Sequence, residues 1–342
     1  GDSVRVKIRK KKKKYAESML LEVIKPSPYR IEPECEYFGT CNGCKMQHID
    51  YSKQLEIKQN IVKNAFERIG GFENVSIPPV LGSEDIYYYR NKLEFSFSND
   101  RWLTSEDMLI ENIDKSFAVG YHIPGFNEKI LDIRACYLQS LTTNNILNLT
   151  RDFFKPTGTS IYTTKTHSGY LRFLTVRKSI YNNGLMVNLI TYDENAELIN
   201  EFAALLRKGI PEVTTLVNSL TQSKAQVALA DNFNIIFGGG FIEEKIGEYR
   251  FKITPNTFFQ TNSKQCEKLF ETATDIADFD KDENVLDLYC GCGAISLFIS
   301  DKVKSVHGVE LSNESIEMAS ENAELNGVGN CTFEAMDVKD YL

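Results

Sequence analysis

The pattern that most directly implies chemistry is a short apolar run, a glycine-rich turn and a second apolar run near the end of the 342-residue sequence. Gly291 and Gly293 let the backbone turn tightly beneath a ligand, where a Cβ would collide with it. The second run, residues 303–309, ends at Glu310, and an acid at that place can accept both hydroxyls of a ribose. The pattern therefore predicts a site for an adenosyl cofactor at the carboxyl edge of a parallel sheet.

A cluster of three cysteines is the second group with chemical potential. Cys35, Cys41 and Cys44 form a C-x5-C-x2-C pattern with glycines at the turns. In a chain of cytosolic character, eight cysteines favour metal ligation or buried thiols over disulfides, and thiolates suit an iron-sulfur cluster or zinc. Cys136 is the best candidate for a fourth ligand, whereas His48 offers a local Cys3His zinc site. The spacing leaves both metals open, together with purely structural thiols.

Helices and strands must position the glycine turn and the cysteine cluster, and the hydrophobic periodicity predicts several of these elements. Residues 51–69 carry apolar side chains at helical spacing. From about 92 to 253 the chain reads mostly as strands with two helices between them, which predicts a mixed α+β middle domain. The predicted strands are 93–97, 117–122, 171–177, 185–192, 215–220 and 249–253, and the predicted helices are 141–154 and 196–208.

The remainder of the chain, from about Asn262, alternates strands and helices. Such alternation predicts a Rossmann-like, doubly wound α/β domain, with the glycine turn leading into a helix from Ala294 to about Ser300. A hydrophobic content of 42% is ample for packed cores in two or three domains. No apolar run approaches the roughly 18 residues that a membrane-spanning helix needs, so we expect a soluble, cytoplasmic protein without a membrane partner.

The first residues are strongly basic. Residues 1–14 carry eight Lys or Arg and one acid, a balance of +7, which leaves −15 on the rest of a chain whose formal net charge is −8. Apolar and basic residues alternate over 4–9, and an apolar run follows at 15–24, as in two strands with a cationic face. The pattern favours a small barrel that tracks a phosphate backbone over a solvated tail.

Taken together, these features resemble the TRAM-bearing RNA uridine-C5 methyltransferases, which make 5-methyluridine in 23S ribosomal RNA. The resemblance spans almost the whole chain. The motifs that carry it are KKKKKYAESMLLEVIKPSPYRIEPEC, CEYFGTCNGCKMQHIDYSKQLEIK, YRNKLEFS, DIRACYLQ, ITPNTFFQTNSKQ and LDLYCGCG. It implies S-adenosyl-L-methionine as cofactor and a [4Fe-4S] cluster held by Cys35, Cys41, Cys44 and Cys136. It also implies RNA, 23S rRNA above all, as the partner, and no obligate protein partner is evident.

The resemblance also assigns roles around the cofactor. Gln260 would contact it near the reacting base, Tyr289 would pack against it, and Asp337 would accept the adenine amino group, beside Gly291 and Glu310 of the turn. Each has a structural alternative: a surface amide for Gln260, a core aromatic for Tyr289 and a helix N-cap for Asp337. Phe258 is expected to stack on the target base or to serve in packing.

The implied reaction begins with a cysteine thiolate that adds to C6 of uracil, after which C5 attacks the methyl donor and a base removes the C5 proton. In the family, the cysteine and a basic glutamate follow the third strand of the cofactor domain, so we expect both beyond Leu342. Cys290 and Cys292 are not expected to replace that cysteine. On this interpretation the 342 residues are an incomplete methyltransferase that is itself inactive.

The expected domains are a partial TRAM-like, OB-like β-barrel (1–32), an iron-sulfur loop and helix (33–91), a mixed α+β RNA-binding domain (92–245) and a Rossmann-like cofactor domain truncated at its C-terminus (246–342). Two other functions are compatible with the sequence. One is a non-catalytic RNA-binding module with a structural metal site and a vestigial cofactor domain. The other is a zinc-bearing methyltransferase that acts on another base.

Overall fold

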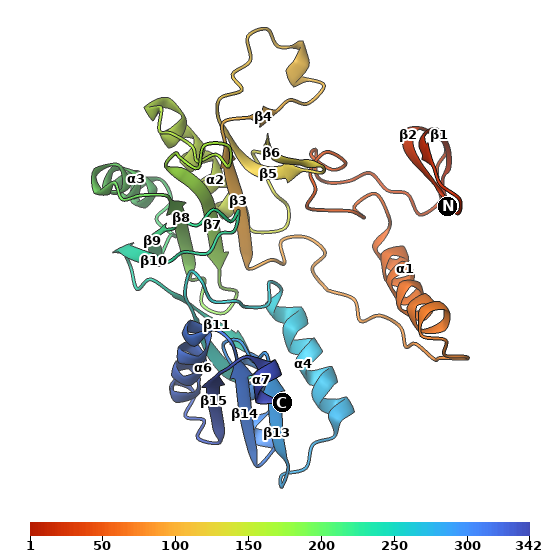
Figure 1. Ribbon diagram of the computed structural model, residues 1–342, viewed down its shortest axis with the longest axis vertical. Coiled ribbons are helices and arrows are strands. Elements are labelled where there is room, and N and C mark those ends of the chain that lie inside the picture. Colours follow the sequence, from red (N-terminus) through yellow and green to blue (C-terminus); the bar gives the residue numbers. More distant parts are fainter. The chain divides into compact units, whose positions relative to one another are not determined.

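The computed structural model describes residues 1–342, apart from the side chain of Asn127. The chain forms two compact units, Gly1–Ile86 and Tyr87–Leu342 (Figure 1). Among the described residues, none of the helices combines the length and apolar character that a bilayer crossing requires.

The first unit contains an antiparallel hairpin and one helix. β1 (Ser3–Lys11) pairs with β2 (Ala16–Lys25), and α1 (Tyr51–Asn64) continues into one π-helical turn, Ala65–Ile69. The predicted strands and helix are therefore confirmed. Nearly all residues of both strands are exposed, and the described residues of this unit form a two-stranded sheet without closing a barrel. The barrel stays a prediction.

The second unit is built on a mixed sheet of eight strands. Their order is β10-β9-β8-β7-β3-β5-β6-β4, and the adjacent inner strands β7 and β8 are buried along almost their whole length. The strands are β3 (Lys92–Ser98), β4 (Arg101–Trp102), β5 (Ala118–Ile123), β6 (Phe126–Asp132), β7 (Leu171–Lys178), β8 (Leu185–Thr191), β9 (Thr215–Leu220) and β10 (Asn232–Phe237). The sequence pattern predicted β3, β5, β7, β8 and β9, whereas β4, β6 and β10 were missed because they are short or carry polar residues.

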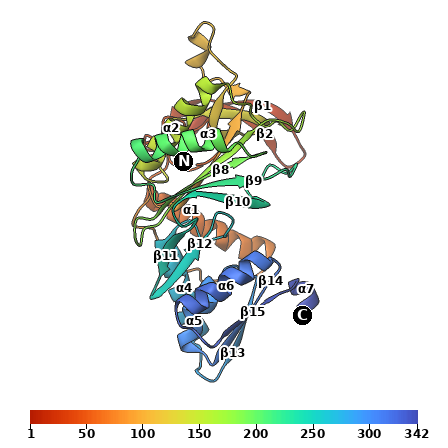
Figure 2. The same cartoon turned by 90° about the vertical axis from the view of Figure 1, so that its left-hand side faces the viewer.

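Two helices, α2 (Leu141–Thr157) and α3 (Ala196–Gly209), cover one face of this sheet side by side (Figure 2). Both were predicted. α2 ends at Gly158, whose φ of 66° is the left-handed conformation that a helix C-cap favours. The two helices meet through aromatic rings, since Phe202 lies 5.5 Å from Phe153 and 5.1 Å from Phe154 between ring centroids. This aromatic contact fixes the helical layer on the sheet.

A second hairpin, β11 (Ile242–Ile246) with β12 (Tyr249–Ile253), connects the large sheet to the C-terminal part (Figure 2). One buried apolar cluster runs through this junction. It includes Met186 and Val217 of the large sheet, Phe251 of the hairpin, and Phe270 and Leu297 of the C-terminal helices. Because this core is continuous, the large sheet and the C-terminal part are packed as one body.

The C-terminal part is a three-stranded parallel sheet in the order β13-β14-β15. Its elements are α4 (Ser263–Ala277), β13 (Asn284–Leu288), α5 (Ala294–Ile299), a 3-10 turn (Ser300–Lys302), β14 (Ser305–Glu310), α6 (Asn313–Leu325), β15 (Cys331–Ala335) and α7 (Val338–Tyr341). The predicted strand-helix alternation, and the helix after the glycine turn, are confirmed. Parallel strands joined by helices place the carboxyl ends of β13 and β14 at one edge, where such sheets bind ligands.

Candidate functional site

The glycine turn after β13 has an unusual backbone. Tyr289, Gly291 and Gly293 all have positive φ, of 65°, 55° and 77°. A Cβ on Gly291 would meet no atom within 4 Å, so the turn is open there, whereas a Cβ on Gly293 would lie 2.9 Å from Leu297. The turn is thus open on one side and closely packed on the other. A non-glycine residue in the left-handed region is uncommon and points to a functional constraint at Tyr289.

Glu310 is brought to this turn by the parallel pairing of β13 and β14. Its Oε2 accepts a hydrogen bond from the Gly291 N–H at 3.4 Å, and its Oε1 accepts from the Ser312 N–H at 3.1 Å. The carboxylate is only half-buried. Each oxygen therefore retains a lone pair that a ligand hydroxyl can use.

Asp287 supports the turn from beneath. Its Oδ2 accepts a hydrogen bond from the Ser296 hydroxyl at 2.5 Å, which connects the end of β13 to the first turn of α5. Burial raises the pKa of Asp287 above its ordinary value, although the bond from Ser296 opposes the shift. The contact fixes the angle at which α5 leaves the turn.

The segment with Phe258 and Gln260 lies beside the turn, since the Cys292 thiol donates to the Phe258 carbonyl at 3.6 Å. Phe259 is in the core with 3% of its surface exposed, while Phe258 is 70% exposed and Gln260 is also exposed. Buried and exposed side chains therefore alternate along this segment, and the Phe258 ring and the Gln260 amide face solvent. Such groups can stack on a base and bind its edge.

Tyr289 and Asp337 are both exposed. Tyr289 has 73% of its side chain in solvent, so the core-aromatic alternative is wrong. Asp337 caps α7 and accepts a hydrogen bond from the Lys339 N–H at 2.9 Å, which is the structural role named as its alternative. The cofactor contacts of both residues stay predictions.

Two buried amides that sequence analysis missed hold the site together. Asn322 of α6, fully buried, donates to the Cys292 carbonyl at 3.2 Å and accepts from the Lys252 N–H at 2.8 Å. Asn91 donates through its side chain to the Gln260 carbonyl at 2.8 Å. An amide among the apolar positions of α6, and an asparagine just before a buried strand, were the available signals.

The thiols of the second unit that lie in or near the cofactor region are poor nucleophiles. Burial raises the pKa of Cys290 to about 12 and that of Cys292 to about 11. Burial likewise raises the pKa of Cys266 to about 12 and that of Cys331 to about 11. Because the thiolate is the reactive form, these four side chains serve in packing at neutral pH.

The metal prediction finds no support in the geometry. Among the described residues there is no group of three or more His, Cys, Asp or Glu that could hold a metal ion. Cys35, Cys41 and Cys44 are half-buried in a loop of the first unit, where the Gly43 N–H donates to the Cys41 sulfur at 3.3 Å. Cys136 belongs to the second unit and is 8% exposed. The described residues therefore give no support for a bound cluster, which stays a prediction.

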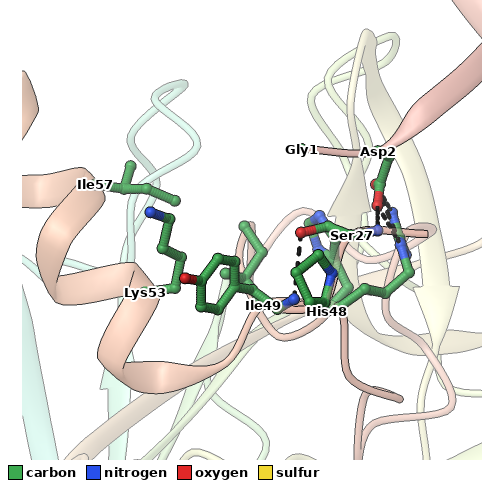
Figure 3. Close-up of a pocket in the computed structure, with 10 residues that line it drawn as sticks. Gly1, Asp2, Ser27, His48, Ile49, Lys53 and Ile57 are labelled. Carbon is green, nitrogen blue, oxygen red and sulfur yellow. Dashed lines mark hydrogen bonds and ion pairs between the residues drawn. The ribbon is translucent and has the colours of Figure 1, made fainter. Parts of the chain in front are cut away.

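His48, the alternative zinc ligand, lines a cavity of about 450 Å³ in the first unit (Figure 3). The same cavity contains Arg30 and Lys53. Arg30 forms a two-point ion pair with Asp2, with Nε 3.1 Å from Oδ1, which lowers the pKa of Asp2 (Figure 3). Burial and the charge of Arg30 lower the pKa of His48. The nearby charge of Arg30 opposes a metal ion at His48, and the charge of Asp2 offsets part of this effect.

Comparison with known proteins connects this geometry to a family. Residues 180–341 match the family model described as tRNA (Uracil-5-)-methyltransferase. An uncharacterized RNA methyltransferase of Chlorobaculum tepidum is 39% identical, with 100% of this chain and 71% of the relative covered. An uncharacterized RNA methyltransferase of Bacteroides thetaiotaomicron is 38% identical, with 100% and 76% covered.

A solved structure shows the same architecture. The Pyrococcus abyssi tRNA (uracil-54, C5)-methyltransferase in complex with S-adenosyl-L-homocysteine has a TM-score of 0.72 and 25% identity, covering 98% of this chain and 73% of that chain. The likeness confirms the mixed α/β fold with its large mixed sheet. Together with the open glycine turn beside Glu310, these matches show that the chain belongs to the RNA uracil-C5 methyltransferase family.

Proposed function

We propose that this protein transfers a methyl group from S-adenosyl-L-methionine to C5 of a uridine in RNA. The observation that carries the proposal is the open turn at Gly291, bordered by the Glu310 carboxylate and joined through Cys292 to the segment that exposes Phe258 and Gln260. A cofactor site and a base-binding segment are thereby held side by side. The family relationship supports the same reaction class.

The residues present fit the cofactor, because the turn leaves open space where its backbone faces a ligand. Glu310 would hold the ribose hydroxyls, Tyr289 would pack against the cofactor and Asp337 would bind the adenine amino group. When bound, S-adenosyl-L-methionine supplies an electrophilic methyl group. Gln260 would orient the uracil edge so that C5 faces that methyl group, which avoids the entropic cost of a bimolecular encounter.

Activation of the base requires a thiolate, since uracil C5 is a weak nucleophile. The thiolate adds to C6, C5 attacks the methyl group, a base removes the C5 proton, and elimination releases the thiolate. We infer that neither Cys290 nor Cys292 supplies this thiolate. The raised pKa values of Cys290 and Cys292 support the inference, because burial keeps both thiols protonated at neutral pH.

The favoured substrate in this proposal is 23S rRNA rather than transfer RNA. Its support is the family resemblance of the cysteine loop and of the basic hairpin, whose lysines at 10–14 are exposed. A [4Fe-4S] cluster on Cys35, Cys41, Cys44 and Cys136 is a separate proposal that rests on the same resemblance alone. It has no step in methyl transfer.

The Glu310→Gln variant tests the cofactor site. Loss of the charged acceptor is expected to weaken S-adenosyl-L-methionine binding by about 1.5–3 kcal/mol, roughly tenfold to hundredfold in Kd, measured by calorimetry. The control is Glu317→Gln, at an exposed position on α6, which should leave Kd unchanged. If the unmodified protein has no affinity for the cofactor, the non-catalytic RNA-binding module becomes the better account.

A suicide substrate tests the nucleophile. The protein, incubated with 5-fluorouridine RNA and cofactor, should form a covalent adduct on a cysteine other than Cys290 and Cys292, identified by peptide mass spectrometry. Cys290→Ser and Cys292→Ser variants should form the same adduct, since their thiols are protonated at neutral pH. An adduct on either residue would contradict the proposal.

RNA selection is tested by methylation rates on 23S rRNA and tRNA transcripts, with the faster rate expected on rRNA. Replacing all five lysines at 10–14 by glutamine should weaken binding to both RNAs and reduce the slope of log K against log salt by up to about 4. Glutamine at Lys281, Lys302 and Lys304, three exposed lysines far along the chain from the hairpin, is the comparison, and it should change the slope less. Faster methylation of tRNA would refute the rRNA assignment.

Metal content is measured on protein purified without oxygen. The cluster proposal expects about four iron and four sulfide ions per chain with visible absorption, and a large loss of iron in the Cys41→Ser variant. Cys331→Ser, in the cofactor region, should retain the iron. Colourless protein without iron, or with stoichiometric zinc, would remove the cluster from the account.

A further inference from the structure

Two arginines on the buried strand β7 each hold a different loop. Arg177 is 3% exposed, and its Nη2 donates to the Thr257 carbonyl at 2.5 Å and to the Pro255 carbonyl at 3.3 Å. Both carbonyls lie just before the exposed Phe258. Burial lowers the pKa of Arg177 to about 10, so the guanidinium remains charged at neutral pH.

Burial of the charged Arg177 guanidinium carries a desolvation cost that destabilises the fold. Carbonyl dipoles compensate a buried guanidinium less completely than a carboxylate does, and the buried Nε of Arg177 has no acceptor among the described residues. The charge of Glu94 compensates part of this cost, but the hydrogen bonds of the guanidinium go to backbone carbonyls. The two carbonyls that it fixes, at Pro255 and Thr257, suggest a role in placing the residues that follow them.

The same segment is fixed on its other side. Asn91 is 5% exposed and donates two hydrogen bonds to the segment. Its side-chain Nδ2 donates to the Gln260 carbonyl at 2.8 Å, and its backbone N–H donates to the Thr261 carbonyl at 2.8 Å. Phe258 and Gln260 thus lie between fixed points before and after them.

A buried carboxylate completes the attachment. Glu244 of β11, which has no exposed surface, accepts from the Ser263 hydroxyl at 3.0 Å, and Ser263 in turn accepts from the Asn91 side chain at 2.9 Å. Glu244 also accepts from the backbone N–H groups of Ile180 and Tyr181, at 3.1 and 3.2 Å. The start of α4 is therefore connected to the loop that follows β7.

We propose that Arg177, assisted by Asn91 and Glu244, is a positioning residue that fixes the 254–262 segment so that Phe258 and Gln260 meet the target uridine in the reactive orientation. This inference rests on the proposed function, because it assigns the base-binding role to that segment. Arg177 touches neither reactant in this account. It acts through the backbone carbonyls that it holds.

The chain provides a matched control on the same strand. Arg172 is also 3% exposed and donates to carbonyls of another loop, those of Thr221 and Ser223 at 2.9 and 2.7 Å. It stacks on Tyr162, with its guanidinium carbon 4.1 Å from the ring centroid. Arg172 also donates to the Ala225 carbonyl at 2.8 Å, so its removal costs at least as many buried hydrogen bonds as removal of Arg177. The hydrogen bonds of Arg172 go to residues 221–225, whereas those of Arg177 go to the 254–262 segment.

The test compares Arg177→Met, Arg177→Lys and Arg172→Met with the unmodified protein. In Arg177→Met we expect kcat for RNA methylation to fall about tenfold to hundredfold, since small misplacement of a reactant has effects of that size, while Kd for S-adenosyl-L-methionine stays within about threefold. Arg177→Lys should recover part of kcat. Arg172→Met should keep kcat within about threefold of the unmodified protein.

Hydrogen-deuterium exchange provides a readout that is independent of catalysis. Exchange should accelerate in residues 254–262 of Arg177→Met, and in residues 221–227 of Arg172→Met. Unchanged exchange at 254–262, or faster exchange there with unchanged kcat, would overturn the positioning role. An equal loss of kcat in Arg172→Met would also overturn it. Absence of methyl transfer by the unmodified protein would instead overturn the proposed function, so the two failures are distinguishable.

Discussion

The cofactor turn has to keep one side of its backbone open while its other side is densely packed, and the second unit is organised around this requirement. Gly293 has no room for a Cβ, because Leu297 and Phe333 lie within 3.0 Å of where it would be. Gly308 likewise makes room for the Cys290 sulfur. Packing beneath the turn keeps the open side fixed before a ligand arrives. Binding to a preformed surface then incurs little ordering entropy.

A second consequence of the packed junction is that the 254–262 segment contacts both the large sheet and the C-terminal part. Phe259 lies in the apolar cluster that joins the large sheet to the C-terminal helices. Asn91, Arg177 and Glu244 attach the neighbouring backbone by buried hydrogen bonds. Apolar contacts give this junction its stability, whereas the directional hydrogen bonds select one conformation of the segment. The exposed positions between these anchors are those at which recognition of a base is proposed.

Burial also separates the cysteines into two chemical groups. Those of the cofactor region have raised pKa values and behave as small apolar residues, even where, as at Cys290 and Cys292, they border the turn. Cys35, Cys41 and Cys44 of the first unit are half-buried. Proximity to a cofactor site is therefore a poor guide to thiol reactivity, because desolvation decides whether the thiolate forms.

The sequence by itself determined the local elements and the residues that need a particular backbone. Hydrophobic periodicity predicted α1, α2, α3 and the parallel strands, and the glycine turn followed by Glu310 predicted an adenosyl site, because both signals come from neighbours in the chain. Only the tertiary structure revealed the anchors of the 254–262 segment. Asn91 and Gln260 are 169 residues apart, and a hydrogen bond between a side chain and a distant carbonyl has no periodic signature in the sequence. The fold had to bring them together before their role could be seen.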